Sequence, residues 1–211
     1  MRSSPTMHKE VPSKEEKDLC KLRCDLIKKR RALSGEELLW ASREVCKRLL
    51  EHPLLKDGMK KIFVGSYSAI GGEIDTRELN HSLRDRNFRV VLPRVTDKNQ
   101  GLMEFYECPE QELITGSFGI MEPSAAKHHM IDPDCISVLL MPLTGFDGNG
   151  NRLGMGGGFY DRYLKRLSER CVLIGLAHDF QQIDQIESRE WDMPLHEIVT
   201  PKRHLICENV V

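Results

Sequence analysis

The sequence predicts an α/β fold, a single three-layer domain in which helices flank a mostly parallel central sheet. Short apolar runs of the kind that form buried strands occur at residues 62–67, 88–93, 136–143 and 172–177. Amphipathic segments lie between the first and second runs and between the third and fourth, and this alternation favours a parallel sheet with right-handed crossovers. With 211 residues, of which 40% are hydrophobic, the chain can bury one sizeable core.

Two helices are predicted ahead of the first strand. One follows the pattern of residues 14–33, which carry leucines at helical spacing and eight basic residues. Ser34 and Glu37 form a capping box for the second helix, which ends before Pro53. A charged helix face is most often simply solvated, so the basic residues alone do not indicate a ligand.

The first two apolar runs predict a β-α-β unit. Between them lies a glycine turn at residues 71–76, where Asp75 and Glu78 predict a capping box for a helix that ends near Arg86. Residues 102–108 alternate weakly between apolar and polar, which indicates an antiparallel strand. The unit therefore predicts parallel pairing of its two strands, with a further strand beside them.

Composition and charge exclude several classes of protein. Lys and Arg total 31 against 32 Asp and Glu, giving a net charge of -1, so no global field draws the chain to nucleic acid or a membrane surface. No apolar run approaches the roughly 18 residues of a membrane span, and the N-terminus lacks the plan of a secretory signal. The seven cysteines are scattered without zinc-site spacing, which indicates reduced thiols in the cytoplasm. Residues 1–13 contain several serines and prolines, so we expect a flexible tail followed by one domain over residues 14–211.

The most informative stretch is a glycine loop at residues 149–162, where a helix is expected to begin at about Phe159. Five of its residues are glycine, and such a loop points backbone N–H groups and the positive end of a helix dipole at one spot. This suits a phosphate. The loop matches neither the Walker A pattern nor Gly-x-Gly-x-x-Gly, and a mobile connector is the alternative. Arg152 and Arg162 flank the loop and favour the phosphate interpretation.

Two further segments follow predicted strands and are expected to lie near the glycine loop. Ligands of α/β sheets bind beyond the carboxyl ends of the strands. The turn after the first strand offers Glu73, and the segment after the fourth offers His178 and Asp179. In the glycine loop, Asp161 fits either the helix dipole or magnesium, which takes one or two carboxylates together with phosphate oxygens.

The glycine loop and the strand before it resemble a known family. Met-Pro-Leu-Thr-Gly-Phe-Asp at residues 141–147 and Gly-Asn-Arg-Leu-Gly-Met-Gly-Gly-Gly-Phe-Tyr-Asp-Arg at 150–162 are similar to the signature of the 5-formyltetrahydrofolate cyclo-ligases, also called methenyltetrahydrofolate synthetases. The resemblance covers most of the chain. It includes the basic first helix, Gly-Glu-Ile-Asp-Thr at 72–76, Ala-His-Asp at 177–179 and Glu-Trp-Asp-Met-Pro-Leu at 190–195.

The resemblance implies a carbon–nitrogen ligase that uses ATP to convert 5-formyltetrahydrofolate to 5,10-methenyltetrahydrofolate, with release of ADP and phosphate. In the family's scheme the formyl oxygen takes the γ-phosphoryl group, the second folate nitrogen attacks the activated carbon, and phosphate leaves. Phosphoryl transfer asks mainly for positioning and charge neutralisation, so no nucleophilic Ser or Cys is required. The implied partners are magnesium, ATP and the folate, with or without a polyglutamate tail, but no nucleic acid and no membrane. We expect a cytoplasmic monomer.

Site residues are implied by the same resemblance. Glu73 and Arg152 would be catalytic, with Glu73 orienting either the formyl group or the attacking N–H. Ser68 stands at a second folate-contact position, where the family commonly has a larger apolar residue. Asp161 and Asp192 match the carboxylates that the family associates with magnesium.

Further implied contacts come from the first helix and the glycine loop. Arg23 matches a residue that the family uses on ATP. The partner position falls at Leu19, so Lys17 or Lys21 would replace it. The nucleotide phosphates would contact Arg152, Leu153, Gly154, Met155, Gly156, Gly157, Gly158, Phe159 and Tyr160, and the folate would border Met155, Gly156, Gly157, Gly158 and Phe159.

Two other functions compete with the ligase. One is a catalytically silent folate- or nucleotide-binding module of the same fold, a kind of domain that also occurs attached to RNA-recognition modules. The near-zero charge and the lack of an aromatic-rich RNA motif argue against that class. The other is a sugar-phosphate or acyl-transfer enzyme on a similar scaffold, since fold does not fix function. It predicts a dedicated catalytic base, for which the sequence offers no candidate.

Overall fold

A computed structural model describes residues 14–56, 62–188 and 192–207. The expected tail at 1–13 lies outside these residues. The helices are α1 (Lys14–Arg31), α2 (Gly35–Leu50), α3 (Arg77–Asp85) and α4 (Phe159–Leu164). The main sheet contains β1 (Phe63–Gly65), β2 (Arg89–Asp97), β3 (Leu102–Glu107), β6 (Ile136–Pro142), β9 (Val172–Leu176), β10 (Glu197–Val199) and β11 (His204–Ile206). Two small hairpins are formed by β4 (Ile114–Thr115) with β5 (Met121–Glu122) and by β7 (Gly145–Phe146) with β8 (Arg152–Leu153).

The seven-stranded sheet has the order β11-β10-β9-β6-β1-β2-β3. Its five inner strands pair in parallel, and only the strands at the two edges, β3 and β11, are antiparallel to their neighbours. The predicted α/β class with a mostly parallel sheet is therefore confirmed. The β-α-β unit and the antiparallel strand at 102–107 are confirmed as well.

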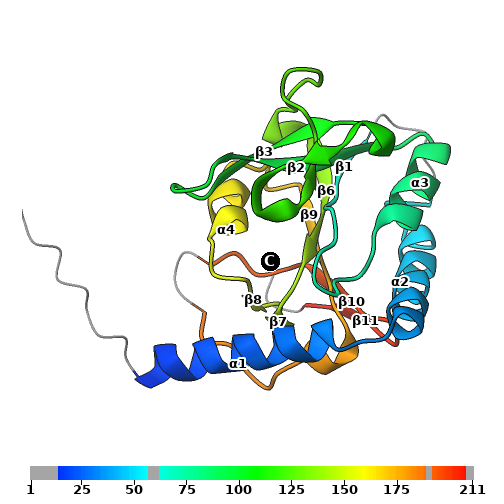
Figure 1. Cartoon of the computed structure of the whole chain (residues 1–211). Coiled ribbons are helices and arrows are strands. Elements are labelled where there is room, and N and C mark those ends of the chain that lie inside the picture. The colour runs from blue at the N-terminus through cyan, green and yellow to red at the C-terminus, as the bar shows by residue number, and fades with distance from the viewer. Residues whose placement is uncertain (1–13, 57–61, 189–191, 208–211) are drawn as a thin grey trace, which may run out of the picture.

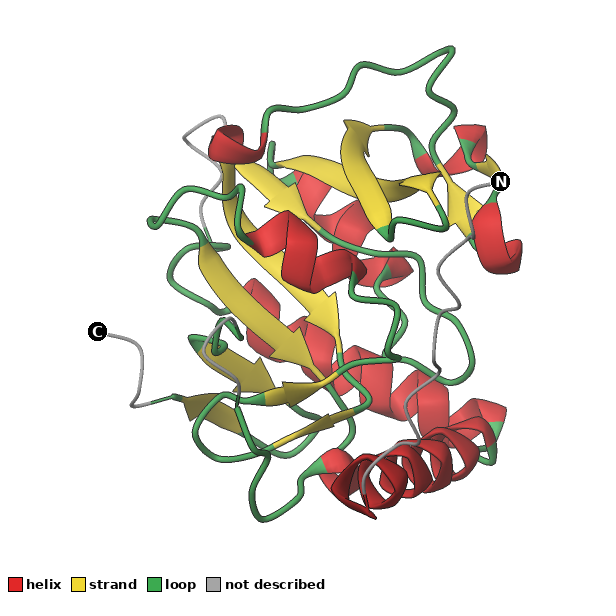
Figure 2. Ribbon diagram, turned by 90° about the vertical axis from the view of Figure 1, so that its left-hand side faces the viewer, coloured by secondary structure: helices red, strands yellow, loops and turns green. Residues whose placement is uncertain are grey.

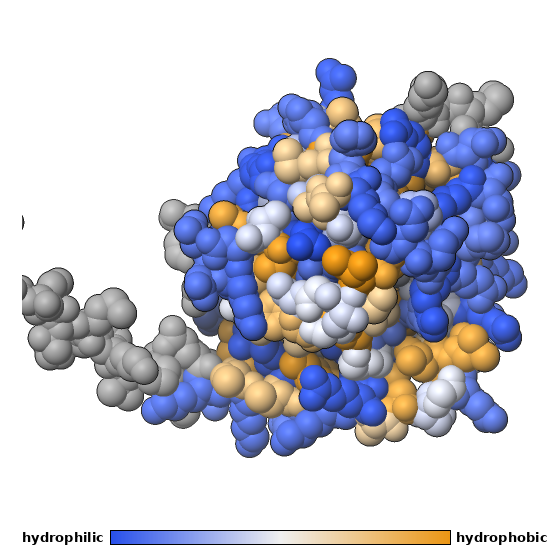
Figure 3. Space-filling model, turned by 45° about the horizontal axis from the view of Figure 1, so that its top comes forward, coloured by the Kyte–Doolittle hydropathy of each residue, from blue (hydrophilic) through white to orange (hydrophobic). Residues whose placement is uncertain are grey.

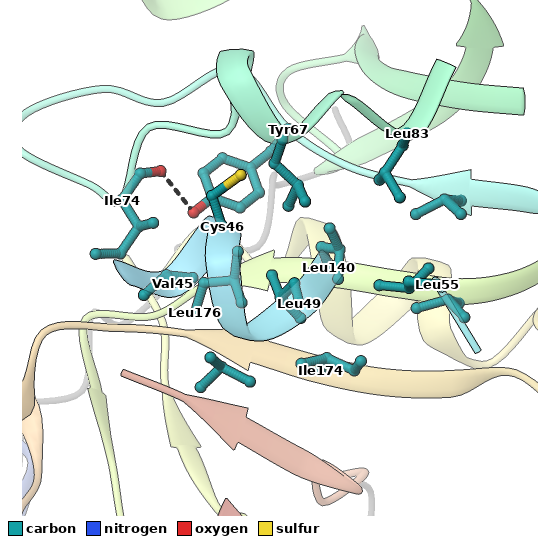
Figure 4. Packing of buried hydrophobic residues seen from close by; sticks show 14 of the residues in the cluster. Val45, Cys46, Leu49, Leu55, Tyr67, Ile74, Leu83, Leu140, Ile174 and Leu176 are labelled. Carbon is teal, nitrogen blue, oxygen red and sulfur yellow. Dashed lines mark hydrogen bonds between the residues drawn. The ribbon is translucent and has the colours of Figure 1, made fainter. Parts of the chain in front are cut away.

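Helices cover both faces of the sheet, which gives the three predicted layers (Figure 2). Because side chains alternate along a strand, Leu140 of β6 faces α2 and α3, while Leu139 faces α4. Figure 4 shows the first of these cores, in which Val45 and Leu49 of α2 pack with the sheet residues, and the buried Tyr67 hydroxyl donates to the Ile74 carbonyl at 2.9 Å.

Helix α1 belongs to neither layer. It runs along one end of the sheet, next to the β7–β8 hairpin (Figure 1). The only buried leucine on its inner side is Leu26, which packs with Leu153 of the glycine loop and with Ile186. The basic first helix is thereby fixed against the segment that was expected to bind phosphate.

The predicted helix starts were right in one case and wrong in another. Ser34 and Glu37 form the capping box at the start of α2. Asp75 and Glu78 do not form one for α3, whose N-cap is Thr76. The Asp75 carboxylate instead accepts hydrogen bonds from the backbone N–H and the guanidinium of Arg77.

The structure gives the state of the cysteines and the lengths of the helices. All seven cysteines are free thiols, four of them buried. Within the part of the chain that the structure describes, no helix is long and apolar enough to span a membrane.

Three polar side chains gather around Glu197, the first residue of β10; the other two are His52 and His204. The ligand atoms of these three side chains lie within 4.8 Å of one another. The Nε2 atoms of His52 and His204 lie 3.0 and 2.6 Å from Oε2 of Glu197. The Leu54 N–H donates to Nδ1 of His52 at 3.2 Å, so a neutral His52 carries its proton on Nε2 and donates it to Glu197. A metal-bound imidazole needs that proton on Nδ1, and we therefore interpret the cluster as hydrogen-bonded rather than metal-binding.

Candidate active site

The three segments that were expected to meet do meet at the carboxyl ends of the strands. Nε2 of His178, just after β9, donates to the Gly72 carbonyl in the turn after β1 at 2.9 Å. Gln181 donates to the carbonyls of Leu143 and Thr144, which follow β6, at 2.6 and 2.9 Å. Burial lowers the pKa of His178, so this residue stays neutral and acts as a structural link.

Glu73 is a buried carboxylate at this edge, with 6% of its surface exposed. Its Oε2 accepts from the Ile70 N–H at 3.0 Å, and its Oε1 lies 3.3 Å from Nη2 of Arg30. Burial raises the pKa of this carboxyl, and the Arg30 charge and the Ile70 N–H counteract part of the rise. A buried carboxylate with a perturbed pKa in such a place is typical of a functional group.

Arg30 was not singled out by sequence reasoning. Its guanidinium is 2% exposed, and it donates from Nε to the Gly71 carbonyl and from Nη1 to the Leu143 carbonyl, each at 3.0 Å. The sequence did carry a signal, because position 30 lies four residues after Leu26 and continues the buried stripe of α1. The run of basic residues around it hid this signal.

The glycine loop has the open backbone that a phosphate site needs. Gly156 and Gly158 adopt φ angles of 93° and 68°, in the left-handed region that favours glycine. A side chain at Gly154 or Gly156 would meet nothing within 4 Å, so the space beside the loop is open. Helix α4 starts at Phe159 as predicted, but it has only six residues. We therefore expect the loop N–H groups, rather than a long helix dipole, to face an anion.

A buried aspartate fixes the base of the loop. Asp147 has no exposed surface, and its Oδ1 accepts from the backbone N–H groups of Asn149 and Asn151 at 2.9 and 3.0 Å. Its Oδ2 accepts from the Ile186 N–H at 3.0 Å. The loop is thus anchored at its first turn and open in its glycine part.

Arg152 and Asp161 form an ion pair across the loop. The Arg152 side chain is 8% exposed and the Asp161 side chain 46%. Arg152 also donates to the carbonyl of Met193, the residue after Asp192. The structure therefore brings Arg152, Asp161 and the chain at Asp192 together, although Asp192 lies about 30 residues along the sequence and follows residues outside the described part.

Tyr160, the second residue of α4, is affected by the charges of both Glu73 and Arg152. Burial raises the pKa of its phenol, the negative charge of Glu73 raises it further, and the charge of Arg152 opposes the rise. The phenol therefore stays neutral, and it lies near enough to the Glu73 carboxylate and to the Arg152 guanidinium for both charges to act on it.

The basic residues that were predicted to bind ATP or phosphate differ in their contacts: the arginines bind carbonyls of the glycine loop, and the lysines are exposed. Arg23 donates from Nε to the Gly154 carbonyl at 2.8 Å, which ties α1 to the glycine loop. Lys17 and Lys21 are exposed on α1. Arg162 donates to the Gly157 carbonyl at 3.1 Å, so it supports the loop from behind.

Apolar side chains lie beside the loop. Phe118, in the segment between β4 and β5, is 55% exposed and packs edge-on against Phe159 with ring centres 6.0 Å apart. Met155 is 51% exposed, and the Ser68 hydroxyl donates to the Met121 carbonyl at 2.6 Å. Figure 3 shows one face of the molecule on which apolar and near-neutral residues gather between hydrophilic ones. Exposed aromatic and thioether groups next to an anion loop suit a flat ring system, and sequence reasoning missed Phe118 because it lies in an irregular connection.

The model of the 5-formyltetrahydrofolate cyclo-ligase family matches residues 14–201. The chain belongs to this family. It is 33% identical over 177 residues to the 5-formyltetrahydrofolate cyclo-ligase of Escherichia coli K12, covering 83% of this chain and 96% of the relative. The cyclo-ligase of Haemophilus influenzae is 35% identical over 138 residues, covering 64% of this chain and 74% of the relative.

Solved structures lead to the same family. The 5,10-methenyltetrahydrofolate synthetase of Aquifex aeolicus superposes with a TM-score of 0.75 and 30% identity, covering 90% of this chain and 93% of that one. The synthetase of Mycoplasma pneumoniae superposes with a TM-score of 0.71 and 26% identity, covering 87% and 99%. The family resemblance expected from the glycine motif is confirmed.

The carboxylates fit the magnesium that the cyclo-ligase resemblance implies. The Arg152 pair uses Oδ1 of Asp161, and this side chain is partly exposed, so its other oxygen can face a cation. Asp192 is partly buried and adjoins the residue whose carbonyl binds Arg152. Magnesium takes one or two carboxylates and fills its other positions with phosphate oxygens and water, which matches a site of two aspartates beside a phosphate loop.

Proposed function

We propose that this chain catalyses the ATP-dependent closure of 5-formyltetrahydrofolate to 5,10-methenyltetrahydrofolate, with release of ADP and phosphate. Family membership over residues 14–201 supports the reaction. The observation that carries it is the meeting of two unlike halves at one edge of the sheet. An open glycine loop with Arg152 can hold phosphates, and a buried carboxylate, Glu73, lies close enough to act on Tyr160, which follows the glycines of that loop.

The glycine loop and Arg152 form the nucleotide half. Backbone N–H groups of residues 152–160 would bind the phosphates, and Arg152 would neutralise charge as the γ-phosphoryl group moves to the formyl oxygen. Arg23 fixes the loop through Gly154 and, with Lys17 or Lys21, is positioned on the α1 side where ATP would lie. Magnesium bound at Asp161 and Asp192 would supply further charge neutralisation at the phosphates.

Glu73 and the exposed apolar residues form the folate half. The folate ring would lie along residues 155–159, near Phe118 and Ser68. Glu73 would orient either the formyl group or the N–H that attacks it. Tyr160 is near both charged groups and is itself neutral, so it adds no charge to the site.

The test is the near-ultraviolet absorbance of methenyltetrahydrofolate when the purified chain meets 5-formyltetrahydrofolate and magnesium-ATP. We expect a rise in absorbance that disappears when ATP is omitted. A folded chain that gives no rise would refute the proposal, and folate and ATP binding by calorimetry would then identify a catalytically silent module. A rise that occurs without ATP would point to a different reaction.

Asp161→Asn tests the magnesium role. We expect turnover to fall about 100-fold or more while the fold is kept, because the amide loses the charge that a divalent cation needs. Turnover is measured across a magnesium titration with circular dichroism as the check on folding. Asp179→Asn is the matched control, since Asp179 also follows a strand but binds Thr200 and Arg203. An Asp161→Asn enzyme with normal turnover at every magnesium concentration would exclude the role.

The same proposal includes a cytoplasmic monomer that accepts folates with or without a polyglutamate tail. The free thiols support a reducing compartment. Sedimentation of the pure chain with and without ligands tests the oligomeric state, and a dimer would contradict it.

A further inference from the structure

Arg30 and Glu73 form the most buried ion pair among the described residues, with side chains 2% and 6% exposed. We propose that Arg30 is a positioning residue for the reaction: it holds Glu73 as an ionised carboxylate in one orientation, so that Glu73 takes the proton of the attacking folate nitrogen. The inference rests on the proposed function, and it decides between the two roles that Glu73 could have there.

The guanidinium of Arg30 is fixed before any ligand binds. Nε is held by the Gly71 carbonyl and Nη1 by the Leu143 carbonyl, each at 3.0 Å. These acceptors come from different strand ends, so the planar group cannot turn without losing one of them. Its remaining nitrogen, Nη2, faces Oε1 of Glu73 at 3.3 Å. A lysine could place one charge here, but its three donors share one nitrogen and could not reach partners that are spread around a guanidinium.

Each oxygen of Glu73 has a partner that favours a negative charge. The Ile70 N–H donates to Oε2 at 3.0 Å, and the Arg30 charge stands at Oε1. Both contacts favour the ionised form, which only accepts hydrogen bonds. An acceptor suits the N–H of the attacking nitrogen, whereas the formyl oxygen needs a donor.

The other groups that act on Glu73 are uncharged. They are the Tyr67 phenol, which donates to the Ile74 carbonyl, and the Tyr160 phenol; the His178 imidazole binds the carbonyl of the adjacent residue, Gly72. Burial keeps each of them neutral. Arg31 adjoins the pair and acts on Arg30 rather than on Glu73. Within the described part of the chain, Arg30 is therefore the cation that offsets the buried carboxylate.

The step balances without a further reactant. The second folate nitrogen forms a bond to the carbon whose oxygen carries the phosphoryl group, and its N–H proton passes to the Glu73 carboxylate. The carbon–oxygen bond then breaks, and its electron pair leaves with phosphate. Glu73 returns the proton to water, so the net reaction is that of the proposed function.

The test compares the pH dependence of turnover in the wild type, Arg30→Met, Arg30→Lys and Arg48→Met. Arg48 is the matched control, because it ties α2 to the Pro201 carbonyl and, among the residues that the structure describes, forms no ion pair. Without the Arg30 charge, Glu73 should take up a proton at higher pH. We expect the acid limb of the Arg30→Met profile to move alkaline by about one pH unit or more. In Arg30→Lys the acid limb should lie close to its wild-type position, because the positive charge is kept. In Arg48→Met the acid limb should not move.

A double-mutant cycle covers the case in which Arg30→Met does not fold. Arg30→Lys keeps a buried cation, and we expect it to lower kcat by about tenfold with Glu73 present but less than about twofold in the Glu73→Gln enzyme. Equal factors in both backgrounds would overturn the proposal, as would a folded Arg30→Met enzyme with an unmoved acid limb. A wild-type chain with no ATP-dependent turnover would instead refute the proposed function, so the two failures are distinguishable.

Discussion

Glu73 and Glu197 are both shielded carboxylates with two partners, yet their pKa values move in opposite directions. At Glu73 burial dominates and the pKa is raised, although Arg30 and the Ile70 N–H oppose the rise. At Glu197 burial also opposes ionisation, but the hydrogen bonds from His52 and His204 outweigh it and the pKa is lowered. A carboxylate in a more open place with two side-chain donors is stabilised, whereas a deeply buried one with a single cation is not.

The difference in pKa is also a difference in what each charge contributes to stability. Ionised Glu197 is favoured by folding, so the protein gains stability from its charge. Ionised Glu73 is disfavoured by folding, so its charge costs stability that other contacts must offset. A protein retains such a carboxylate where the chemistry uses it, and the position of Glu73 at the carboxyl edge of the sheet agrees with that interpretation.

The sharpest test of the comparison is turnover in Glu73→Gln and Glu197→Gln. Both changes keep the shape of the side chain and remove the charge. We expect kcat to fall about 100-fold or more in the first, because a proton acceptor is lost, and to change less than about twofold in the second. ATP binding, measured by calorimetry, should survive in both. Comparable losses of turnover would mean that Glu73 has no special place in the reaction.

Gly72→Ala tests whether the turn fixes Glu73. Gly72 has a φ of 80°, and a Cβ there would lie 2.4 Å from the Arg30 carbonyl oxygen. We expect unfolding to become easier by about 1–3 kcal/mol, with a loss of turnover as Glu73 moves. Gly35→Ala is the control, since a Cβ at that position, the first residue of α2, meets nothing within 4 Å. Gly35→Ala should raise the free energy of unfolding by roughly 0.5–1 kcal/mol, measured by thermal or denaturant unfolding. Equal effects at the two glycines would contradict the strained turn.

The smallest expected effect is the change with pH in how much Glu197 contributes to the free energy of unfolding. The folded pKa of Glu197 lies below its ordinary value of 4.5, so its contribution is complete above that pH and is lost as pH falls through the folded pKa. Glu197→Gln should therefore lower the free energy of unfolding by about 1–2 kcal/mol at pH 7 and by less near pH 3. Urea unfolding at both pH values measures this. A deficit that grows towards acid would show that the carboxylate is not the stabilising form.

The sheet could be predicted because local pattern decides it. The apolar run at 136–143 is buried on both faces as β6, and Ser34 with Glu37 caps α2 through contacts within four residues. Asp75 failed as a cap because Arg77, two residues later, competes for its carboxylate. The helix after the glycine loop ends at Leu164, although apolar residues continue at its spacing. Strand β11 was not foreseen because it lies at the sheet edge with two of its three residues exposed, so it has no buried apolar run.

The site could be predicted only in part. Glu73 and the glycine loop follow strands, so the rule for parallel sheets placed them at one edge without the structure. The Arg152–Asp161 pair could also have been predicted from the sequence, since both residues lie in the glycine loop. Arg30 and Phe118 depend on contacts across more than 40 residues with Glu73 and Phe159, and no local pattern reports such contacts. The roles of the individual site residues stay predictions.

Helix α1 touches both halves of the site, through Arg23 on Gly154 and Arg30 on Glu73. These arginines are seven residues apart, which on a helix is about two turns and roughly 10 Å along the axis. The helix therefore sets the distance between the glycine loop and the Glu73 carboxylate. Inserting or deleting one residue between them would swing one arginine about 100° around the axis, so both could not be engaged together. The length of this short stretch should then be far less free to vary than the identity of the solvent-facing residues along it.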